Sequence, residues 1–379
     1  MRILHVVGAM NRGGVETWLM HVLGNIDKRR YKMDFLVHVA DPGLFDDEIR
    51  SQGSKITSCA YVKSPILYAW RLFRYLMSSG NRYDIIHSHV HGFSGWVLMV
   101  GAFAGVPIRI AHSHSDLRYQ DQGDSFFRYI YKLIVRWLIS IFATHRLAVS
   151  ENAAVSLFGK NWRRKSTVMY CGVDLKPFSM VHADADFRAS FGIESDDVVI
   201  GHVGRMEQPK NHMFLLDVFK EALSRDRRCR LLLVGDGSLR CSVEDYARKI
   251  GVDSRVIFAG SRDDVPRILL SAMNVFIFPS LWEGLPLTLI EAQAAGLRCI
   301  VSESVTAEVS LGGCTYLPLN IGAGAWADAL LENLELGRCT SGYESVGSSA
   351  FSLPASLSSL LSFYENAYKR VADSRKAAF

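Results

Sequence analysis

The sequence lacks several features that would place it quickly in a class of protein. It has no uninterrupted apolar run of about 18 residues, the length that crosses membrane hydrocarbon: Val97–Val106 is too short, and Leu133–Ala143 contains Arg136. Its seven cysteines show no CxxC spacing, which argues against zinc and disulfide frameworks and favours free thiols in a reducing compartment. No basic segment, longer apolar region and cleavage site follow Met1, so we expect no signal peptide and a cytoplasmic location.

The sequence also lacks a strong charge of either sign. Its 43 Lys and Arg against 38 Asp and Glu leave a formal charge of +5, spread along the chain, and no segment interleaves aromatic with basic clusters. Nucleic-acid partners are therefore not expected. Hydrophobic residues at 49% and charged residues at 21% are ordinary for a globular protein. At 379 residues the chain exceeds the usual size of one core, which predicts two domains of roughly 150–200 residues.

Short apolar runs alternate with longer helical patterns along the whole chain, which is typical of a doubly wound α/β fold. Ligands of such sheets bind beyond the carboxyl ends of the strands, so we expect two Rossmann-like domains facing across a shared cleft. The predicted strands are ILHVV, DFLVHV, DIIHSHV, IRIAHS, HRLAVS and STVMY in the first set, and VVIGHVG, CRLLLVG, RVIFAG, NVFIFPS and RCIVS in the second.

Domain boundaries follow from breaks in this alternation. Residues 174–195 are polar, contain Pro177 and lack periodicity, which predicts a linker. The two domains are then residues 1–173 and 196–353. A loop-like stretch at Thr340–Ser349 precedes residues 354–379, which have helical spacing and are expected to form a terminal helix that docks back on the first domain.

The strongest chemical signal is a pair of acids, Glu283 and Glu291, after the strand NVFIFPS. The segment is predicted to open a helix that continues to Ala295. Amide groups at a helix start attract an anion, Gly284 allows a ligand close to the backbone, and carboxylates accept hydrogen bonds from hydroxyl groups. This pattern predicts a polyol and phosphate site, although two solvated acids on one helix face would look the same.

The second signal lies between the strand VVIGHVG and a predicted helix at Asn211–Ser224. Arg205 and Lys210 at this strand end can grip a diphosphate, unless they are ordinary surface cations. Glycine-containing turns follow two later strands, at Gly235–Gly237 and Gly260–Arg262. They are expected to flank a nucleobase and ribose, with a purely structural turn as the alternative for Gly235–Gly237.

Two features of the first half complete the candidate site. Gly13 and Gly14 follow the first strand and precede a helix, so their amides can approach a phosphate or sugar, or simply form a turn; the GxGxxG pattern is not satisfied. Histidines recur at alternate positions on one strand face near two strand ends: His87, His89 and His91, then His112 and His114. No carboxylate or cysteine accompanies them at metal spacing, so we predict no metal site.

The E-x7-E pattern with an internal GLP, preceded by FPS, resembles the signature of family 4 (group 1) glycosyltransferases with the GT-B fold. The resemblance covers essentially the whole chain, and RIAHSHS with SESVTAEVSLGG resembles the exopolysaccharide and capsule subgroup. It is carried by an ordered set of segments: GGVE, DIIHSHVHG, GVPIRIAHSHS, YCGVD, GRMEQPKN, LVGDG, FAGSRDDV and EAQAAGL.

The resemblance implies a retaining hexosyltransferase-type enzyme of cell-surface polysaccharide biosynthesis. It would move a sugar from a nucleotide sugar, most simply a UDP-sugar, to a saccharide or lipid-linked saccharide acceptor. The first domain would bind the acceptor and the second the donor. Arg205 and Lys210 would neutralise the leaving diphosphate, so that no metal or other cofactor is required. Asp184 and Asp186 imitate a metal motif but lie in the predicted linker, so we interpret them as a solvated loop.

The resemblance also assigns roles to individual residues. The catalytic group is Glu283, Arg205 and Lys210 with one histidine, His114 as the more loop-proximal or His112 as the alternative; His89 and Glu16 are expected at the acceptor. Cys171 stands where the family pattern has asparagine, so contacts of that asparagine are not carried over. The expected donor-binding residues are Gly13, Gly14, Gly204, Arg205, Lys210, Gly260, Ser261, Arg262, Glu283, Gly284, Leu285, Pro286, Thr288 and Glu291.

Residues 126–139 mix aromatic and aliphatic side chains with Arg128, Lys132 and Arg136 at four-residue steps. Such a helix suits either peripheral contact with the cytoplasmic membrane face or packing in the core. Two alternatives to a glycosyltransferase also fit the pattern. One is an epimerase or phosphorylase of similar fold, and the other is a non-catalytic nucleotide-sugar-binding subunit of a polysaccharide assembly complex.

Overall fold

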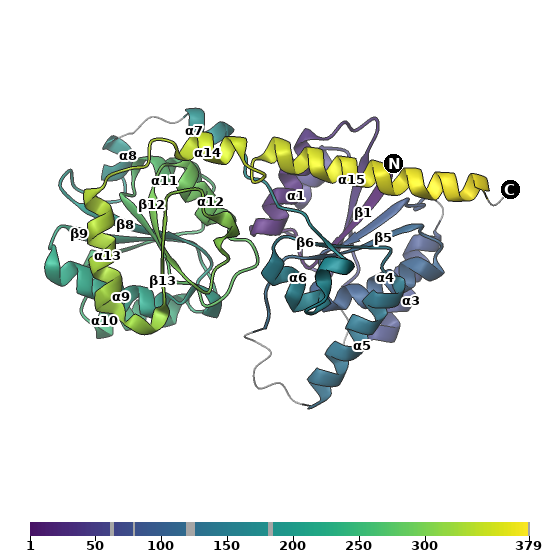
Figure 1. Ribbon diagram of the computed structural model, residues 1–379, viewed down its shortest axis with the longest axis horizontal. Coiled ribbons are helices and arrows are strands. Elements are labelled where there is room, and N and C mark those ends of the chain that lie inside the picture. Colours follow the sequence, from purple (N-terminus) through teal and green to yellow (C-terminus); the bar gives the residue numbers. More distant parts are fainter. Residues whose placement is uncertain (61–63, 79, 119–125, 181–184, 378–379) are drawn as a thin grey trace. The chain divides into compact units, whose positions relative to one another are not determined.

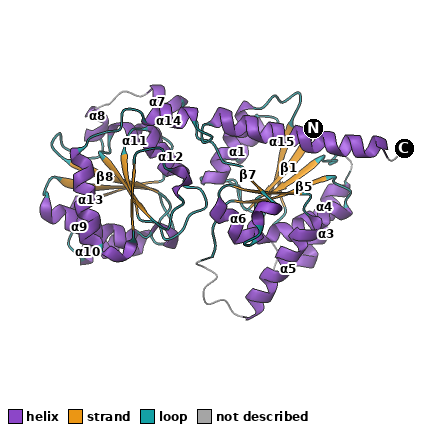
Figure 2. Ribbon diagram, viewed as in Figure 1, coloured by secondary structure: helices purple, strands orange, loops and turns teal. Residues whose placement is uncertain are grey.

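The computed structural model describes residues 1–60, 64–78, 80–118, 126–180 and 185–377. The chain divides into two compact units. The N-terminal unit consists of Met1–Gly172 and Leu353–Phe379, and the C-terminal unit is Val173–Ser352. In each unit a central sheet is enclosed by helices (Figure 1 and Figure 2). This arrangement confirms the prediction of two Rossmann-like α/β units.

The N-terminal unit contains a parallel seven-stranded sheet with the order β3-β2-β1-β4-β5-β6-β7. The strand order reverses between β1 and β4, whose Cα partners include His5 and His87. In open parallel sheets ligands bind beyond the carboxyl ends of the strands at such a switch point. The strands are β1 Arg2–Val7, β2 Lys32–Val37, β3 Ile56–Ser58, β4 Ile85–Ser88, β5 Ile108–Ser113, β6 His145–Ala148 and β7 Thr167–Val168.

Helices cover both faces of this sheet, and the last of them is the C-terminal helix of the chain. Trp18 on the first helix and Tyr364 on the last are both fully buried in this unit. The helices are α1 Gly14–Asn25, α2 Asp46–Ser51, α3 Pro65–Met77, α4 Ser94–Phe103, α5 Phe126–Phe142, α6 Glu151–Phe158 and α15 Leu353–Ala377.

The C-terminal unit contains a parallel six-stranded sheet with the order β10-β9-β8-β11-β12-β13. Its switch point lies between β8 and β11, which pair at Ile200 and Val275. Nearly all residues of these two strands are buried, as expected for strands covered on both faces. The strands are β8 Val198–Val203, β9 Cys229–Val234, β10 Val256–Gly260, β11 Val275–Phe278, β12 Arg298–Ser302 and β13 Cys314–Leu317.

The helices of the C-terminal unit flank this sheet (Figure 1). A core of Leu215, Phe219 and Trp326 fixes two of them on one face. The helices are α7 Lys176–Met180, α8 Ala185–Ala189, α9 His212–Arg225, α10 Arg240–Lys249, α11 Val265–Ser271, α12 Leu287–Ala294, α13 Ala323–Glu335 and α14 Gly342–Ser348.

The structure differs from the sequence-based expectation in segments of weak periodicity. The supposed irregular stretches contain α7, α8 and α14, whose five to seven residues are too short to show a helical repeat. Two edge strands, β3 and β13, were not predicted. Asp184 lies outside the described residues, and Asp186 is exposed.

Two further observations concern the helices and the cysteines. No helix among the described residues combines the length and apolar character needed to cross a bilayer. All seven cysteines are free, as predicted.

Candidate functional site

Two loops meet at the switch point of the C-terminal unit. One follows β8 and runs from Gly204 to Asn211, and the other follows β11 and runs from Pro279 to Pro286. The Leu281 amide donates to the Pro209 carbonyl at 2.8 Å, and the Asn211 side-chain amide donates to the Pro279 carbonyl at 3.2 Å. The loops that carry the two strongest sequence signals therefore support each other directly.

Lys210 and Glu283 form an ion pair at this junction. The Lys210 Nζ lies 2.6 Å from the Glu283 Oε1, and the side chains are only 18% and 13% exposed. The same ammonium lies 4.6 Å from the centre of the Phe278 ring, at the end of β11. Water screens such a pair much less than it screens surface ions. The arrangement holds one cation and one carboxylate in fixed positions where a ligand of this sheet would bind.

The helix α12 begins at Leu287 and not at Glu283, where the sequence pattern placed its start. The helix begins at Leu287, with Pro286 as its N-cap, so Glu283 and Gly284 belong to the preceding loop. The physical reason is Pro286, because the residue before a proline is disfavoured in helical conformation. Glu283 and Glu291 therefore come from different elements, and the prediction that they share one helix was wrong.

The first turn of α12 presents groups suited to an anion. The first four amides of a helix have no partner within it. The buried Thr288 Oγ1 and the buried Ser280 Oγ also have no hydrogen-bond partner in the part of the chain that the structure describes. Unpaired buried hydroxyls are rare because they lose hydration without compensation. They lie on either side of Leu285 and Pro286 in the sequence, next to the start of α12.

Glu291 lies one turn after Thr288 on α12. The residue as a whole is half-buried. Its carboxyl group is removed from solvent, and this burial raises the pKa of Glu291 to about 7. Perturbed acids of this kind concentrate at functional sites. Glu291 can accept hydrogen bonds from hydroxyl groups when it is ionised.

Two glycines of the neighbouring turn are required for packing. A Cβ at Gly235 would lie 2.1 Å from the Gly204 carbonyl oxygen, and one at Gly237 would lie 2.5 Å from the Met206 carbonyl oxygen. Gly235 also has a φ of +134°, which favours glycine. Between the two alternatives that the sequence left open, the contacts support a structural turn that supports the Gly204–Lys210 loop.

The remaining predicted donor residues border the same end of the sheet. Gly260 ends β10 with a φ of +67° and accepts a hydrogen bond from the Gly235 amide at 2.8 Å. Ser261 is exposed beside it, and Arg262 is paired with Asp264 at 2.6 Å. Arg205 is exposed after β8. The side chain of Arg262 is therefore already engaged.

In the N-terminal unit, Gly13 and Gly14 lie at the start of α1, with Gly13 as its N-cap. A Cβ at Gly13 would lie 2.3 Å from the Glu16 Oε2, so the Glu16 carboxylate lies against this loop. Glu16 also raises the pKa of the buried Cys171 thiol, after the larger effect of burial itself. The Gly13 loop, the Glu16 carboxylate and Cys171, near the end of the predicted first domain, are thus close together.

The histidines near β4 and β5 form a compact cluster. His89 Nδ1 lies 2.8 Å from His114 Nε2, and His87 Nε2 lies 3.0 Å from His112 Nδ1. His112 is completely buried, while His114 keeps partial exposure. Of the two candidates that the sequence left open, His114 is the one that a ligand can reach.

His89 and His91 differ in their surroundings. Both ring nitrogens of His89 face other histidines, His5 and His114. An acceptor would therefore contact the ring nitrogens of His89 only after one of these bonds opens. His91 lies outside the expected strand pattern, because β4 ends at Ser88 and His91 begins a short 3-10 helix with a φ of +45°.

Three members of this cluster were not predicted from the sequence. His5 on β1 contacts His89, with its Nδ1 2.9 Å from the His89 Nε2. Tyr364 on α15 contacts His87 Nδ1 at 2.6 Å, and the Cys171 Sγ lies 3.9 Å from His114 Nδ1. The raised pKa keeps this thiol protonated at neutral pH. Only the strand order, in which β1 lies beside β4, could have brought His5 into the prediction.

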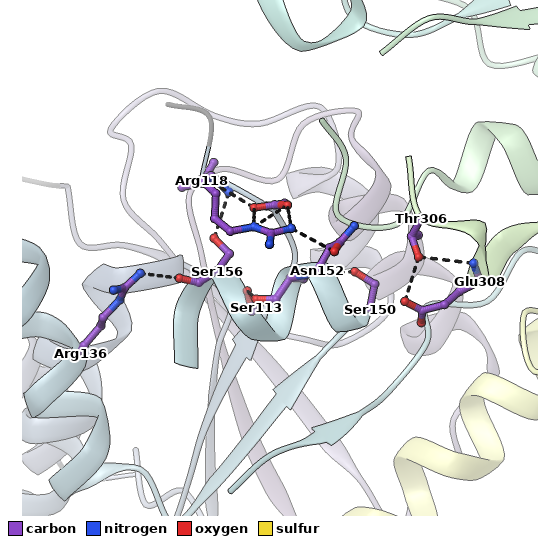
Figure 3. Close-up of polar contacts among 11 residues, drawn as sticks. Ser113, Arg118, Arg136, Ser150, Asn152, Ser156, Thr306 and Glu308 are labelled. Atoms are coloured by element: carbon purple, nitrogen blue, oxygen red, sulfur yellow. Dashed lines mark hydrogen bonds and ion pairs between the residues drawn. The ribbon is translucent and has the colours of Figure 1, made fainter. Parts of the chain in front are cut away.

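Polar contacts stabilise the loop that follows β5 and His114 (Figure 3). Arg118 Nε donates to the buried Asp116 carboxylate at 2.8 Å, and its Nη2 donates to Asn152 at 3.0 Å. Arg136 on α5 donates to the Ser156 carbonyl at 2.7 Å. Arg136, one of the three cations that recur at four-residue steps on α5, thus connects this helix to α6.

These observations define a class of protein. The chain has two doubly wound parallel sheets, and the switch point of one of them carries groups that can bind an anion. Two such α/β units are the components of the GT-B architecture. Comparison with known proteins agrees. Residues 12–177 match the family described as Glycosyltransferase Family 4, and residues 197–335 match Glycosyl transferases group 1. The chain is 35% identical to EpsF of Bacillus subtilis, which carries the name of a glycosyltransferase, over 89% of this chain and 88% of EpsF. The chain belongs to the family 4, group 1 glycosyltransferases.

Two further relatives are also named as glycosyltransferases, and a solved structure has the same fold. An Escherichia coli enzyme named UDP-Gal:alpha-D-GlcNAc-diphosphoundecaprenol alpha-1,3-galactosyltransferase is 31% identical over 60% of each chain. The capsular polysaccharide biosynthesis glycosyltransferase CapH of Staphylococcus aureus is 27% identical over 80% of this chain and 81% of CapH. The structure of Anabaena HepE with UDP and glucose superimposes with a TM-score of 0.78 at 16% identity, over 97% of this chain and all of HepE. The last comparison shows the fold.

Proposed function

We propose that this glycosyltransferase is a retaining enzyme that uses a nucleotide diphosphate sugar, most simply a UDP-sugar. The observation that carries the proposal is the Lys210–Glu283 pair beside the first turn of α12, at the switch point of the C-terminal unit. The ammonium, the helix-start amides and Arg205 stabilise the diphosphate as it leaves. Glu283 accepts hydrogen bonds from the donor sugar, and Glu291 accepts them from the ribose.

Two relatives support the choice of donor. The E. coli relative is named for a UDP-galactose donor, and HepE was solved with UDP and glucose. We propose that Gly260 to Arg262 contact the base through their backbone, since the Arg262 side chain is paired with Asp264. The N-terminal unit contributes Gly13, Gly14 and His114 to the donor, and Glu16 to the acceptor.

The acceptor in this proposal is a saccharide or a lipid-linked saccharide, and the process is the assembly of a cell-surface polysaccharide. The E. coli relative is named for a diphosphoundecaprenol-linked acceptor and CapH for capsular polysaccharide. Attack on the same face from which the diphosphate departs retains the anomeric configuration without a nucleophilic side chain. The leaving diphosphate is the natural acceptor of the hydroxyl proton.

A donor screen followed by product analysis tests this function. Calorimetry with UDP, GDP and their sugars identifies the nucleotide, and transfer to undecaprenyl-diphosphate saccharides is then followed by mass spectrometry. We expect micromolar affinity for one nucleoside diphosphate and a product whose anomeric signal in NMR matches that of the donor. A folded enzyme that binds none of these compounds, or a product of inverted configuration, contradicts the proposal.

We predict that transfer needs no divalent cation at the diphosphate. Lys210 and Arg205 supply the positive charge that Mg²⁺ supplies in other phosphate sites. Turnover in buffer without Mg²⁺ or Mn²⁺ should stay within about twofold of turnover with either ion, because the basic side chains remain in place. A strict requirement for added Mg²⁺ in initial-rate measurements would show that these cations are not sufficient.

We further propose that α5 contacts the cytoplasmic face of a membrane. Only Val135, Leu138 and Ile139 of this helix are buried, whereas Phe127 is 83% and Trp137 is 61% exposed. Exposed aromatics also occur on α3, which packs on α4 as α5 does. Large exposed apolar surfaces mark interaction sites, and aromatic side chains favour the membrane interface.

Substitution of these aromatics should release the protein from lipid. The double variant Phe127→Ser/Trp137→Ser is expected to bind phospholipid vesicles at least about tenfold more weakly, since each buried aromatic contributes roughly 1.5–3 kcal/mol. Co-sedimentation with zwitterionic vesicles, with and without anionic lipid, measures this. Leu336→Ser is the matched control, because Leu336 is 63% exposed in the C-terminal unit. Equal sedimentation of both variants would contradict the contact.

A further inference from the structure

Three histidines at the switch point of the N-terminal unit have the arrangement of a metal site. His5 comes from β1, and His87 and His89 come from the end of β4 and the residue after it. One ring nitrogen of each lies within 4.8 Å of the others. The ring centres of His87 and His89 are 4.3 Å apart, and His5 lies 5.2 Å from both. Two neighbouring strands thus bring three imidazoles close together.

The cluster lies in the interior of the N-terminal unit. His5 and His87 are completely buried, and His89 is half-buried.

Two nitrogens of this group already face each other. His5 Nδ1 lies 2.9 Å from His89 Nε2, and these are the two atoms that one ion can bridge. The other nitrogen of the His5 ring, Nε2, has no hydrogen-bond partner among the described residues, and the ring stacks on Phe35.

We infer that His5, His87 and His89 bind one divalent cation of the zinc class. Three imidazoles with an open fourth position are a common coordination set for zinc, and imidazole also suits copper and nickel. No carboxylate belongs to this set, which disfavours magnesium and calcium, because these ions prefer oxygen ligands. The histidine geometry carries the metal site itself, and only its role behind His114 rests on the proposed function.

The groups around the three ligands support this assignment. Metal-bound histidines usually use their second nitrogen in a hydrogen bond that orients the ring. His87 Nδ1 contacts the buried Tyr364 hydroxyl at 2.6 Å, and His89 Nδ1 contacts His114 Nε2 at 2.8 Å. The remaining His87 nitrogen, Nε2, lies 3.0 Å from His112 Nδ1, so an ion on Nε2 replaces this contact. The α15 helix therefore fixes one ligand, and the second is connected to the histidine proposed for the donor.

This connection gives the ion a role in positioning. A cation on His89 Nε2 leaves the proton on His89 Nδ1, which must then donate to His114 Nε2. The proton of neutral His114 is consequently held on its Nδ1. Without the ion, the chain of imidazoles can orient its protons in either direction. We therefore assign His89 a supporting role behind His114 in place of direct acceptor contact.

Metal binding to tag-free protein tests the site without any substrate. Calorimetric titration of metal-stripped wild type with Zn²⁺ should give one equivalent bound, and Co²⁺ should give the visible absorption of a low-coordinate, nitrogen-bound ion. His5→Phe, which keeps an aromatic ring against Phe35, should weaken Zn²⁺ binding at least tenfold. The control His38→Phe removes a half-buried histidine outside the cluster and should bind as wild type does.

Thermal melting separates loss of the site from loss of the fold. Zn²⁺ should raise the melting temperature of wild type and of His38→Phe but not of His5→Phe, which must itself melt cooperatively without the ion. If His5→Phe does not fold, His87→Gln takes its place, because glutamine can still contact Tyr364. Wild type without stoichiometric Zn²⁺ binding, or equal affinity in wild type and the folded variant, overturns the inference.

Discussion

Replacing Lys210 by methionine is expected to lower kcat by about a thousandfold, the effect of removing one preorganised group that stabilises developing charge. The ammonium is held by Glu283 at 2.6 Å and lies over the Phe278 ring, in a place where water screens it poorly. Its charge acts most strongly when the diphosphate leaves, so the loss should appear in kcat and not only in KM. Initial rates with the cognate donor measure both constants.

A second substitution separates catalysis from stability. Lys210→Met leaves the Glu283 carboxylate buried without its partner, which should lower the free energy of unfolding by about 1–3 kcal/mol. The double variant Lys210→Met/Glu283→Gln removes this unpaired charge and should regain much of the stability while remaining inactive. Urea denaturation and initial rates on the same preparations distinguish the two effects.

The matched control for this series is Lys249→Met, at an exposed position on α10 in the same unit. It removes the same charge from the protein but leaves the switch point intact, so kcat should be unchanged. If Lys210→Met kept more than about a tenth of the wild-type kcat, its ammonium would not be the group that stabilises the leaving diphosphate.

The central strands of both sheets could be predicted because they are buried on both faces and appear as continuous apolar runs. β8 and β11 are examples. The edge strands β3 and β13 could not, since each has only three or four residues and is less completely buried. The position of Arg205 and Lys210 after β8 followed from the order of strand and helix alone.

The details of the site depended on contacts that a sequence pattern does not contain. The spacing of Glu283 and Glu291 suggested one helix, but Pro286 moves the start of α12 to Leu287. His5 is one histidine within an apolar strand and shows no spacing relation to His87, which is far away in sequence. The parallel pairing of β1 with β4 brings them together.

Glu291→Gln is expected to raise the donor KM by roughly ten- to hundredfold, since a hydrogen bond to a charged group contributes about 1.5–3 kcal/mol. A hydroxyl donates better to the ionised carboxylate than glutamine can accept. In wild type, burial raises the Glu291 pKa to about 7, so donor affinity should decline as pH falls below 7. This decline should be absent in Glu291→Gln, as calorimetry at a series of pH values can measure.

The same substitution should stabilise the free protein. The Glu291 pKa is higher in the folded state, about 7, than the ordinary 4.5, so the folded state binds more protons between these values and stability falls as pH rises through this window. Above pH 7 the buried charge lowers the free energy of unfolding by at most about 3 kcal/mol. Glutamine avoids this charge, so the stability of Glu291→Gln should exceed that of wild type at pH 8 and approach it near pH 4.5.

Urea denaturation of wild type and Glu291→Gln at both pH values checks this difference. Glu332→Gln on α13 is the control, because Glu332 is exposed and its loss should add no pH-dependent difference. A variant that binds donor poorly and unfolds at higher urea concentration at pH 8 would show that Glu291 is kept for binding at the expense of stability. Equal denaturation midpoints at pH 8 would mean that the Glu291 carboxyl is hydrated and not buried in the folded protein.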